Sequence, residues 1–348
     1  MVSFALVQLS KKHTEIFGTF IEIILHNNWD LYMYYNKNDD PYTFINYYET
    51  IFKTKFNIRK SSSLMNHKDD HDFYIFTSSA DDVRMDDYFK STHMANKCIF
   101  VNHQAPHWRP YMHKNILMSP VITSPELNKE KYETIVPIYK SYKKMHANIK
   151  QTNLAIIGAI RPHQKDKDLK LLTNLLETYP NEEYNIYVFM RKMDWKVISN
   201  RNPFLKNNPH IQFFSGLSTD KMIEKLKEVK FILPLSKKDG WFYWQRLTGT
   251  IPLAINLNIP LIMDKKLAKI YDLEEACLLY DKNISEIMPK ILSISDEKYF
   301  ELIENVVLYK KEIYKINTKR FINLCLSQVN IEPEYEKNDL KRNLLTYS

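Results

Sequence analysis

Residues 230–264 read KFILPLSKKDGWFYWQRLTGTIPLAINLNIPLIMD, and this stretch decides the fold. The short apolar run 231–235 contains a proline, is followed by a serine, and predicts a buried strand. The next residues, 237–249, predict a turn and then a helix, and Pro252 suits the first turn of a second, short helix. The run 259–263 predicts another buried strand. A strand, a helix and a parallel strand form one βαβ unit, and ligands bind at the carboxyl ends of such strands.

Length and composition indicate an ordinary two-domain protein. The chain has 348 residues, 44% of them hydrophobic and 26% charged, which is enough for two domains that each bury a core. The 49 lysines and arginines exceed the 41 acids, so the net charge is +8. Because the lysines are spread along the chain, a solvated basic surface is the favoured interpretation. The alternative is an anionic partner such as phosphate, nucleic acid or a membrane surface.

Two features of the sequence indicate in which cellular compartment the protein resides: its cysteines and its lack of long apolar runs. Cys98, Cys277 and Cys325 are far apart, and each lies in an apolar run, which predicts buried thiols in a reducing compartment. No Cys/His spacing indicates zinc. The first 13 residues do not resemble a secretory signal, and no apolar run reaches the roughly 18–20 residues of a membrane span. We therefore expect a cytoplasmic protein without a transmembrane segment, for which peripheral membrane contact remains possible.

Predicted strands alternate with predicted helices along the chain, which indicates parallel sheets with helices on both faces. A basic, polar segment interrupts the pattern at about 140–151. We therefore expect an α/β protein of two Rossmann-like domains whose parallel sheets face a central cleft. The expected parts are residues 1–148, residues 149–331 and a polar tail, 332–348. The last two helices are predicted at 296–314 and 318–329.

The opening stretch resembles the donor-binding segment of GT-B glycosyltransferases. In that family a strand ending in proline precedes an acid-Gly-aromatic turn, a helix and a small-x-Pro-hydrophobic strand. Here the turn is Asp239, Gly240 and Trp241, and the last strand contains the sequence NIPLI at 258–262. Retaining members place two glutamates eight positions apart. Asp239 stands in the first position, but the second position is occupied by Leu247.

A second motif, IGAIRPHQKDKDL at 157–169, resembles the GT-B pattern of a strand, a glycine, a basic residue and Lys-x-x-Asp-Leu opening a helix. Gly158, Lys165 and Asp168 fit this pattern with one residue inserted, and Arg161 is a second cation nearby. Glycine allows a ligand to approach the backbone, and a helix N-terminus favours anions. A Lys/Arg pair can neutralise a diphosphate leaving group. The alternative interpretation is a solvated basic turn before a helix.

In the first domain, His103 follows a predicted strand at 98–102. It resembles the histidine that some retaining GT-B enzymes place across the cleft from the donor sugar, where imidazole can bind a hydroxyl or act as a base. An ordinary loop histidine is the alternative. Asp70 and Asp72 form an acid-x-acid triplet like that of metal-dependent GT-A enzymes. Here the apolar strand follows the triplet instead of preceding it, so we predict a solvated loop.

The resemblance implies a GT-B glycosyltransferase that moves a sugar from a nucleotide diphosphate donor to an unknown glycan, protein or lipid acceptor, with either stereochemical outcome. His103 and Asp239 would be catalytic, and the donor would be bound by Gly158, Arg161, Lys165, Gly240, Trp241 and Arg246. No metal and no cofactor are expected, because the cations can neutralise the diphosphate.

Two alternatives stay open. One is a GT-B-like protein that binds a nucleotide sugar or glycan without turnover. The other is a basic nucleic-acid-binding protein, although we expect no nucleic-acid partner because the sequence lacks a basic-aromatic stripe.

Overall fold

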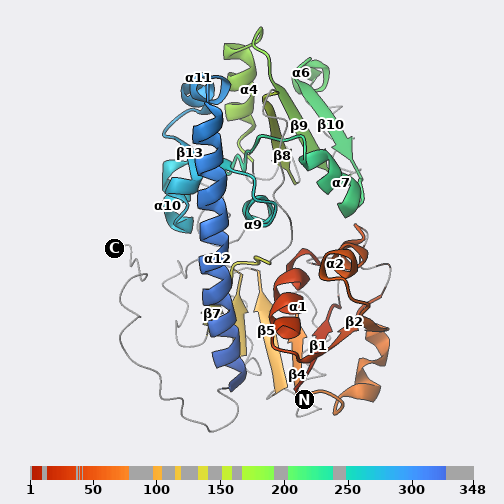
Figure 1. Cartoon of the computed structure of the whole chain (residues 1–348). Coiled ribbons are helices and arrows are strands. Elements are labelled where there is room, and N and C mark those ends of the chain that lie inside the picture. Colours follow the sequence, from red (N-terminus) through yellow and green to blue (C-terminus); the bar gives the residue numbers. More distant parts are fainter. Residues whose placement is uncertain are drawn as a thin grey trace, which may run out of the picture.

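The computed structural model describes residues 2–9, 14–36, 38, 40, 42–77, 97–103, 114–118, 132–139, 151–158, 167–191, 203–237 and 248–326, and the structural statements below concern these residues. Two sheets lie one above the other, each with helices packed on it (Figure 1). The long helix α12, Asp296–Leu326, runs along one side of both halves (Figure 1).

The first sheet has seven parallel strands in the order β3-β2-β1-β4-β5-β6-β7. Its central strands are buried along their whole length, as expected when helices cover both faces of a parallel sheet. The strands are β1 Ser3–Val7, β2 Asp30–Tyr34, β3 Asn57–Arg59, β4 Phe73–Phe76, β5 Cys98–Asn102, β6 Lys114–Leu117 and β7 Tyr132–Thr134. The helices are η1 Thr14–Ile16, α1 Phe17–His26, α2 Phe44–Phe52 and η3 Ser61–His67.

The second sheet has six parallel strands in the order β10-β9-β8-β11-β12-β13. The strands are β8 Asn153–Ile157, β9 Asn185–Met190, β10 Ile211–Ser215, β11 Phe231–Ile232, β12 Leu261–Asp264 and β13 Cys277–Tyr280. The helices before α12 are α4 Leu169–Thr178, α6 Pro203–Asn207, α7 Thr219–Leu226, α9 Thr250–Asn256, α10 Lys265–Tyr271, η7 Glu274–Ala276, η8 Ile284–Ile287 and α11 Met288–Leu292. The predicted α/β class with two parallel sheets is confirmed.

The three cysteines are buried and free, as predicted. No helix among the described residues is long and apolar enough to cross a membrane. The predicted domain boundary at 148/149 and the tail 332–348 lie outside the described residues.

The break predicted between two C-terminal helices is wrong. A single helix, α12, continues from Asp296 to Leu326. Thr318, which was predicted to start a new helix, donates its hydroxyl to the Tyr314 carbonyl one turn earlier (2.8 Å). The first part of α12 packs on the second half of the molecule. Its last turns reach the first sheet, where Arg320 donates to the Thr134 carbonyl (2.9 Å).

The segment that leaves the first sheet after β7 is held by two buried asparagines. Asn317 of α12 donates to the Val136 carbonyl (2.6 Å) and accepts from the Val136 N–H (3.3 Å). Asn256 of α9 accepts from the Tyr139 N–H (2.9 Å) and donates to the Pro137 carbonyl (3.2 Å). These side chains pair backbone groups that have no sheet partner, so they fix the path of the chain toward the second domain.

Candidate functional site

The strand order of each sheet reverses direction next to its central strand. In the first sheet β2 and β4 lie on opposite sides of β1, and in the second β9 and β11 lie on opposite sides of β8. In open α/β sheets, ligands bind at the carboxyl ends of the strands at such reversal points. The carboxyl ends of the two sheets face each other. Tyr42, which follows β2, accepts hydrogen bonds from the N–H (2.8 Å) and hydroxyl (2.6 Å) of Thr219, which follows β10.

Gly158 stands at the reversal point of the second sheet, directly after β8. Its φ of +103° is a backbone conformation that residues with a Cβ rarely adopt. The residue is exposed, and no described heavy atom lies within 4 Å of the position that a Cβ would take. The backbone therefore favours the predicted glycine, and the described part of the chain leaves the space beside it open.

A lysine that the sequence analysis did not select lies at the same point. The Lys167 ammonium donates to the Pro234 carbonyl (2.6 Å), beyond β11, and lies 3.4 Å from the Thr250 hydroxyl. Thr250 in turn donates to the Ile157 carbonyl at the end of β8 (2.9 Å). A positive charge therefore sits between the carboxyl ends of β8 and β11. The sequence signal for it was weak, because Lys165 matched the family pattern and Lys167 did not.

The end of β11 is shaped by a bend. The strand predicted at 231–235 is assigned only over Phe231–Ile232, although the Leu233 N–H still donates to the Ala155 carbonyl of β8 (2.7 Å). Pro234 has no N–H to donate and ends the pairing. Leu235 then has a φ of +48°, an unfavourable conformation for a side chain of this kind. Its carbonyl accepts from the Asp168 N–H (2.7 Å), and the Asp168 carboxylate caps α4 through the N–H groups of Lys170 and Leu171. The motif around Asp168 and the end of β11 are thus connected.

On the first sheet, His103 lies directly after β5 and is half-buried. Its Nε2 is 2.8 Å from the Thr77 carbonyl, at the end of the neighbouring strand β4. A carbonyl only accepts, so Nε2 carries the proton in this contact. The Thr77 hydroxyl donates to the Val7 carbonyl at the end of β1 (3.2 Å). The ends of three strands are therefore linked, and the orientation of the imidazole is set by β4.

His103 and Gly158 are the two predicted site residues within the described part of the chain, and they lie at the carboxyl ends of strands in different sheets. The remaining predicted residues lie outside the described residues. They are Arg161, Lys165, Asp239, Gly240, Trp241 and Arg246.

The acidic triplet lies at the other end of the first sheet. The Asp72 carboxylate accepts from the N–H of Ser3 (2.8 Å), where β1 begins. The Asp70 carboxylate contacts His67 Nδ1 (2.7 Å) and the Arg59 guanidinium (3.2 Å), and these hydrogen bonds lower the pKa of Asp70. Among the described residues, no group of three or more His, Cys, Asp or Glu side chains is placed to hold a metal ion.

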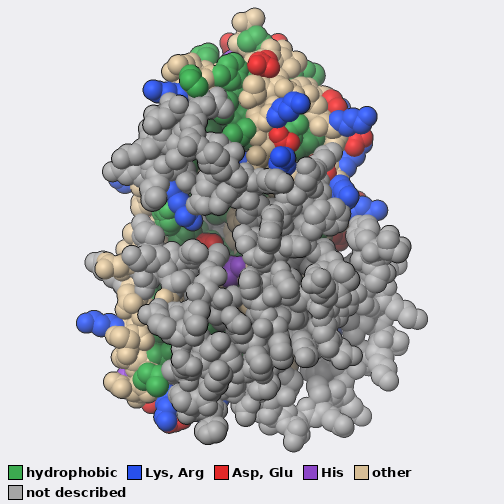
Figure 2. Space-filling view, turned by 180° about the vertical axis from the view of Figure 1, so that it is seen from behind, with side chains coloured by type: hydrophobic (Ala, Val, Ile, Leu, Met, Phe, Trp, Pro, Cys, Tyr) green, Lys and Arg blue, Asp and Glu red, His purple; other side chains and the backbone are tan. Residues whose placement is uncertain are grey.

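Basic side chains do not gather in one patch on the surface that can be described. Figure 2 shows lysine and arginine side chains scattered among acidic ones over the upper half of the molecule. Ion pairs in the described chain include Lys225 at the end of α7 with Glu228 just beyond it (2.8 Å), and Lys298 with Glu301 within α12 (2.6 Å). On this face the arrangement fits the solvated basic surface favoured by the sequence.

No protein-family model and no curated protein matches the chain. Solved structures do match it over nearly its whole length. An α-glucosyltransferase (AGT) in complex with UDP has a TM-score of 0.62 at 10% identity, covering 93% of this chain and 100% of its own. HepE from Anabaena in complex with UDP has a TM-score of 0.58 at 11% identity, covering 93% and 99%. The lipopolysaccharide outer core galactosyltransferase WaaB has a TM-score of 0.54 at 13% identity, covering 94% and 100%. The chain therefore has the GT-B fold, with two Rossmann-like domains built on parallel sheets.

Proposed function

We propose that the protein is a GT-B glycosyltransferase that transfers a sugar from a UDP-sugar to an acceptor hydroxyl. The observation that carries this proposal is the reversal point of the second sheet. There, a backbone conformation suited to glycine and a lysine ammonium lie at the carboxyl ends of β8 and β11, on the edge that faces the first sheet. Similarity of fold alone would not suffice, because one fold can serve many functions. Two of the similar enzymes, AGT and HepE, bind UDP in this fold, which supports UDP as the nucleotide.

The cations stabilise the leaving group in this proposal. As the bond between the sugar and the diphosphate breaks, negative charge grows on the departing UDP, and fixed positive charges lower the energy of that transition state. Lys167 lies at the required edge, and Arg161 and Lys165 precede it in the same segment. Gly158 allows the phosphates to approach the backbone. Because side chains supply this charge, we propose that the reaction needs no divalent metal ion.

The sugar is held from both domains. In this proposal Asp239, Gly240 and Trp241 bind its hydroxyl groups and Arg246 adds a phosphate contact, although all four lie outside the described residues. His103 reaches the sugar from the first domain, and its ring is oriented by the Thr77 carbonyl. His103→Ala is accordingly expected to lower turnover more than UDP binding.

The buried, separate thiols support a reducing compartment, and we propose the cytoplasm.

The test is binding of UDP and UDP-sugars, measured by thermal shift and calorimetry. UDP at one hundred times its Kd should stabilise the fold by about 2.7 kcal/mol, a rise of roughly a few degrees in Tm, and ADP, CDP and GDP should do less. Replacing Arg161 and Lys165 together with Ala should weaken UDP binding by about ten- to a hundredfold, because charge-assisted hydrogen bonds are lost. Lys290→Ala, on the exposed face of α11, is the control.

Three outcomes would contradict the proposal. The first is that no uridine nucleotide shifts the Tm, and the second is unchanged UDP binding in the double variant. The third is UDP-sugar binding without transfer or hydrolysis, which would favour the alternative of a binding protein without turnover. Steeply salt-dependent binding of DNA or RNA with no nucleotide effect would favour the nucleic-acid alternative.

A further inference from the structure

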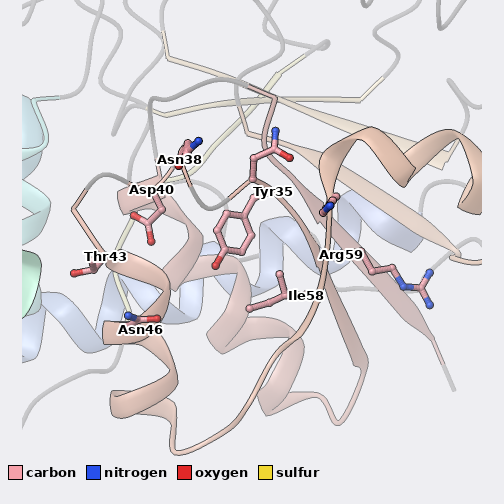
Figure 3. Close-up of a pocket in the computed structure, with 9 residues that line it drawn as sticks. Tyr35, Asn38, Asp40, Thr43, Asn46, Ile58 and Arg59 are labelled. Carbon is pink, nitrogen blue, oxygen red and sulfur yellow. The ribbon is translucent and has the colours of Figure 1, made fainter.

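A pocket of about 490 Å³ lies in the first domain, beyond the carboxyl ends of β2 and β3 (Figure 3). Its volume falls within the roughly 300–1,000 Å³ of small-molecule sites. It is lined by residues of the segment after β2, by the start of α2 and by residues 58–60. His103, Gly158 and Lys167, the described residues proposed to act on the UDP-sugar, do not line it, so we consider another ligand for this pocket.

The lining combines amide groups with an apolar surface. Asn36, Asn38 and Asn46 have exposed side chains, and each amide both donates and accepts hydrogen bonds. The Tyr35 ring is half-buried, and Ile58 is 46% exposed, so both offer apolar surface to a ligand. Figure 3 shows the Tyr35 ring with Asp40 on one side and Ile58 on the other.

Two of the charged groups in the lining are engaged within the protein. The Asp40 carboxylate is 9% exposed and caps α2, with one oxygen accepting from the Phe44 N–H (3.0 Å) and the other from the Ile45 N–H (2.9 Å). The Arg59 guanidinium donates to the Tyr34 hydroxyl (2.8 Å) and to Asp70 (3.2 Å), and it points away from Tyr35 (Figure 3). Among the described lining residues, the groups that a ligand meets are therefore mainly neutral amides, a tyrosine and an isoleucine, with Lys60 exposed at the edge.

This combination suits a neutral sugar. A pyranose ring presents hydroxyl groups that both donate and accept around its rim, and these match amides. It also presents C–H groups on its faces, and these match an aromatic ring or an aliphatic side chain. A purely apolar ligand would offer no hydrogen bonds to the exposed amides of Asn38 and Asn46. For a strongly anionic ligand, Lys60 would be the main cation among the described lining residues.

The pocket opens beside the second domain. Thr43 lines it, and the preceding residue, Tyr42, accepts both hydrogen bonds from Thr219 of the second domain. It therefore lies on the same edge of the first sheet as the proposed transfer site. We propose that this pocket is an acceptor subsite that binds a neutral sugar unit of a glycan. The proposal rests on the glycosyltransferase function proposed above, because that function supplies the need for an acceptor.

The test uses the full chain and a panel of methyl glycosides of glucose, galactose, mannose and N-acetylglucosamine, with binding followed by saturation-transfer NMR and titration. At least one glycoside should bind, and its C–H protons should receive saturation. Asn38→Ala and Asn46→Ala should each weaken that binding by about three- to tenfold. Asn46→Ala also favours α2, so a loss of binding would not come from unfolding.

Asn57→Ala is the matched control. Asn57 is also an exposed asparagine, and it precedes Ile58 in β3, so its side chain points to the opposite face of the sheet. The Asn57→Ala variant should bind the glycoside as tightly as the native protein does. The idea is wrong if no glycoside of the panel binds, or if both pocket variants bind it unchanged. A third outcome would also contradict the proposal that the pocket binds a neutral sugar. In that outcome, methyl glucoside 6-phosphate binds more tightly than the neutral glycosides, and Lys60→Ala removes this preference.

UDP thermal shifts measured on the same samples separate the two proposals. If UDP binds but the pocket variants have no effect on glycosides, the acceptor subsite is wrong and the transferase proposal stands. If glycosides bind in the pocket but no uridine nucleotide binds, the transferase proposal fails and the pocket is a glycan site of another kind of protein.

Discussion

Single residues account for the geometry at the carboxyl edge of the second sheet, and Gly158 is the clearest case. Its φ of +103° would strain any other residue, although a Cβ there would meet no described atom within 4 Å. Gly158→Ala should therefore lower the free energy of unfolding by about 1–3 kcal/mol through backbone strain alone. It should also reduce the rise in Tm that UDP causes. Urea denaturation and the thermal shift measure the two effects.

Gly249 provides a matched control for this substitution. A Cβ at Gly249 would also meet no described atom within 4 Å, but its backbone is helical (φ −59°, ψ −16°). Gly249→Ala should leave stability unchanged or raise it by up to about 1 kcal/mol. Equal losses of stability in both variants would contradict the strain argument.

A buried histidine should give the first domain a dependence on pH. His71 is 3% exposed, and its Nε2 lies 2.9 Å from the Tyr34 hydroxyl, to which Arg59 donates. Burial, with a smaller effect from the Arg59 charge, lowers the pKa of His71 to about 4. The unfolded chain binds this proton near pH 6.5, so the stabilising contribution is complete above that pH and is lost as the pH falls toward 4.

The prediction is a comparison of urea denaturation at pH 7 and pH 4. The native protein should lose on the order of 2–3 kcal/mol more than His71→Gln over this range, because the variant has no group to protonate there. His26→Gln, at an exposed position on α1, controls for the loss of an imidazole in general. Identical pH dependence in the native protein and His71→Gln would show that His71 is not held neutral by the fold.

Among the described helices, α12 is the longest, and it packs on both halves of the molecule (Figure 1). The predicted break at 315–317 would have left the two sheets with separate helices. Instead, Asn317 stays inside the helix and uses its side chain to pair both backbone groups of Val136. Asn has only a modest helix propensity, so its place in the middle of α12 is decided by these buried hydrogen bonds.

Asn317→Leu tests this role. The substitution favours the helix locally but leaves the buried Val136 N–H without this partner. The Val136 carbonyl keeps only the Ile138 N–H (2.7 Å), so we expect a loss of about 1–3 kcal/mol in the unfolding free energy. Asn305 is the control on the same helix. Its amide donates to the Glu275 carbonyl (2.9 Å) near the surface, and Asn305→Leu should cost less than about 1 kcal/mol. A small effect of Asn317→Leu would mean that the segment after β7 finds other partners.

At the scale of the whole molecule, one of the three clusters of buried apolar residues in the described part of the chain spans both domains. A contiguous cluster of buried apolar residues contains Ile99 and Val101 of β5 as well as Ala155 and Ile157 of β8. Phe321, near the end of α12, is fully buried in it, and its ring is 5.7 Å from that of Phe4. Two domains that share a hydrophobic interface of this kind should unfold together.

Calorimetry should therefore show one unfolding transition, and UDP should raise the Tm of that single transition. Phe321→Ala should lower the stability of that single transition by about 3–5 kcal/mol. Two separate transitions, of which only one responds to UDP or to Phe321→Ala, would show that the domains unfold independently in spite of the shared core.

The sequence by itself determined the α/β class, the parallel sheets and the place of Gly158, because apolar periodicity and the turn before a helix are local signals. It located His103 at the end of β5, but not the Thr77 carbonyl that orients its ring. The tertiary structure alone decided the continuity of α12, the position of Lys167 between two strand ends and the asparagine-lined pocket. Each of these depends on residues far apart in the chain. Their hydrogen bonds and burial contribute several kcal/mol, whereas a local preference at one position is worth less than about 1 kcal/mol.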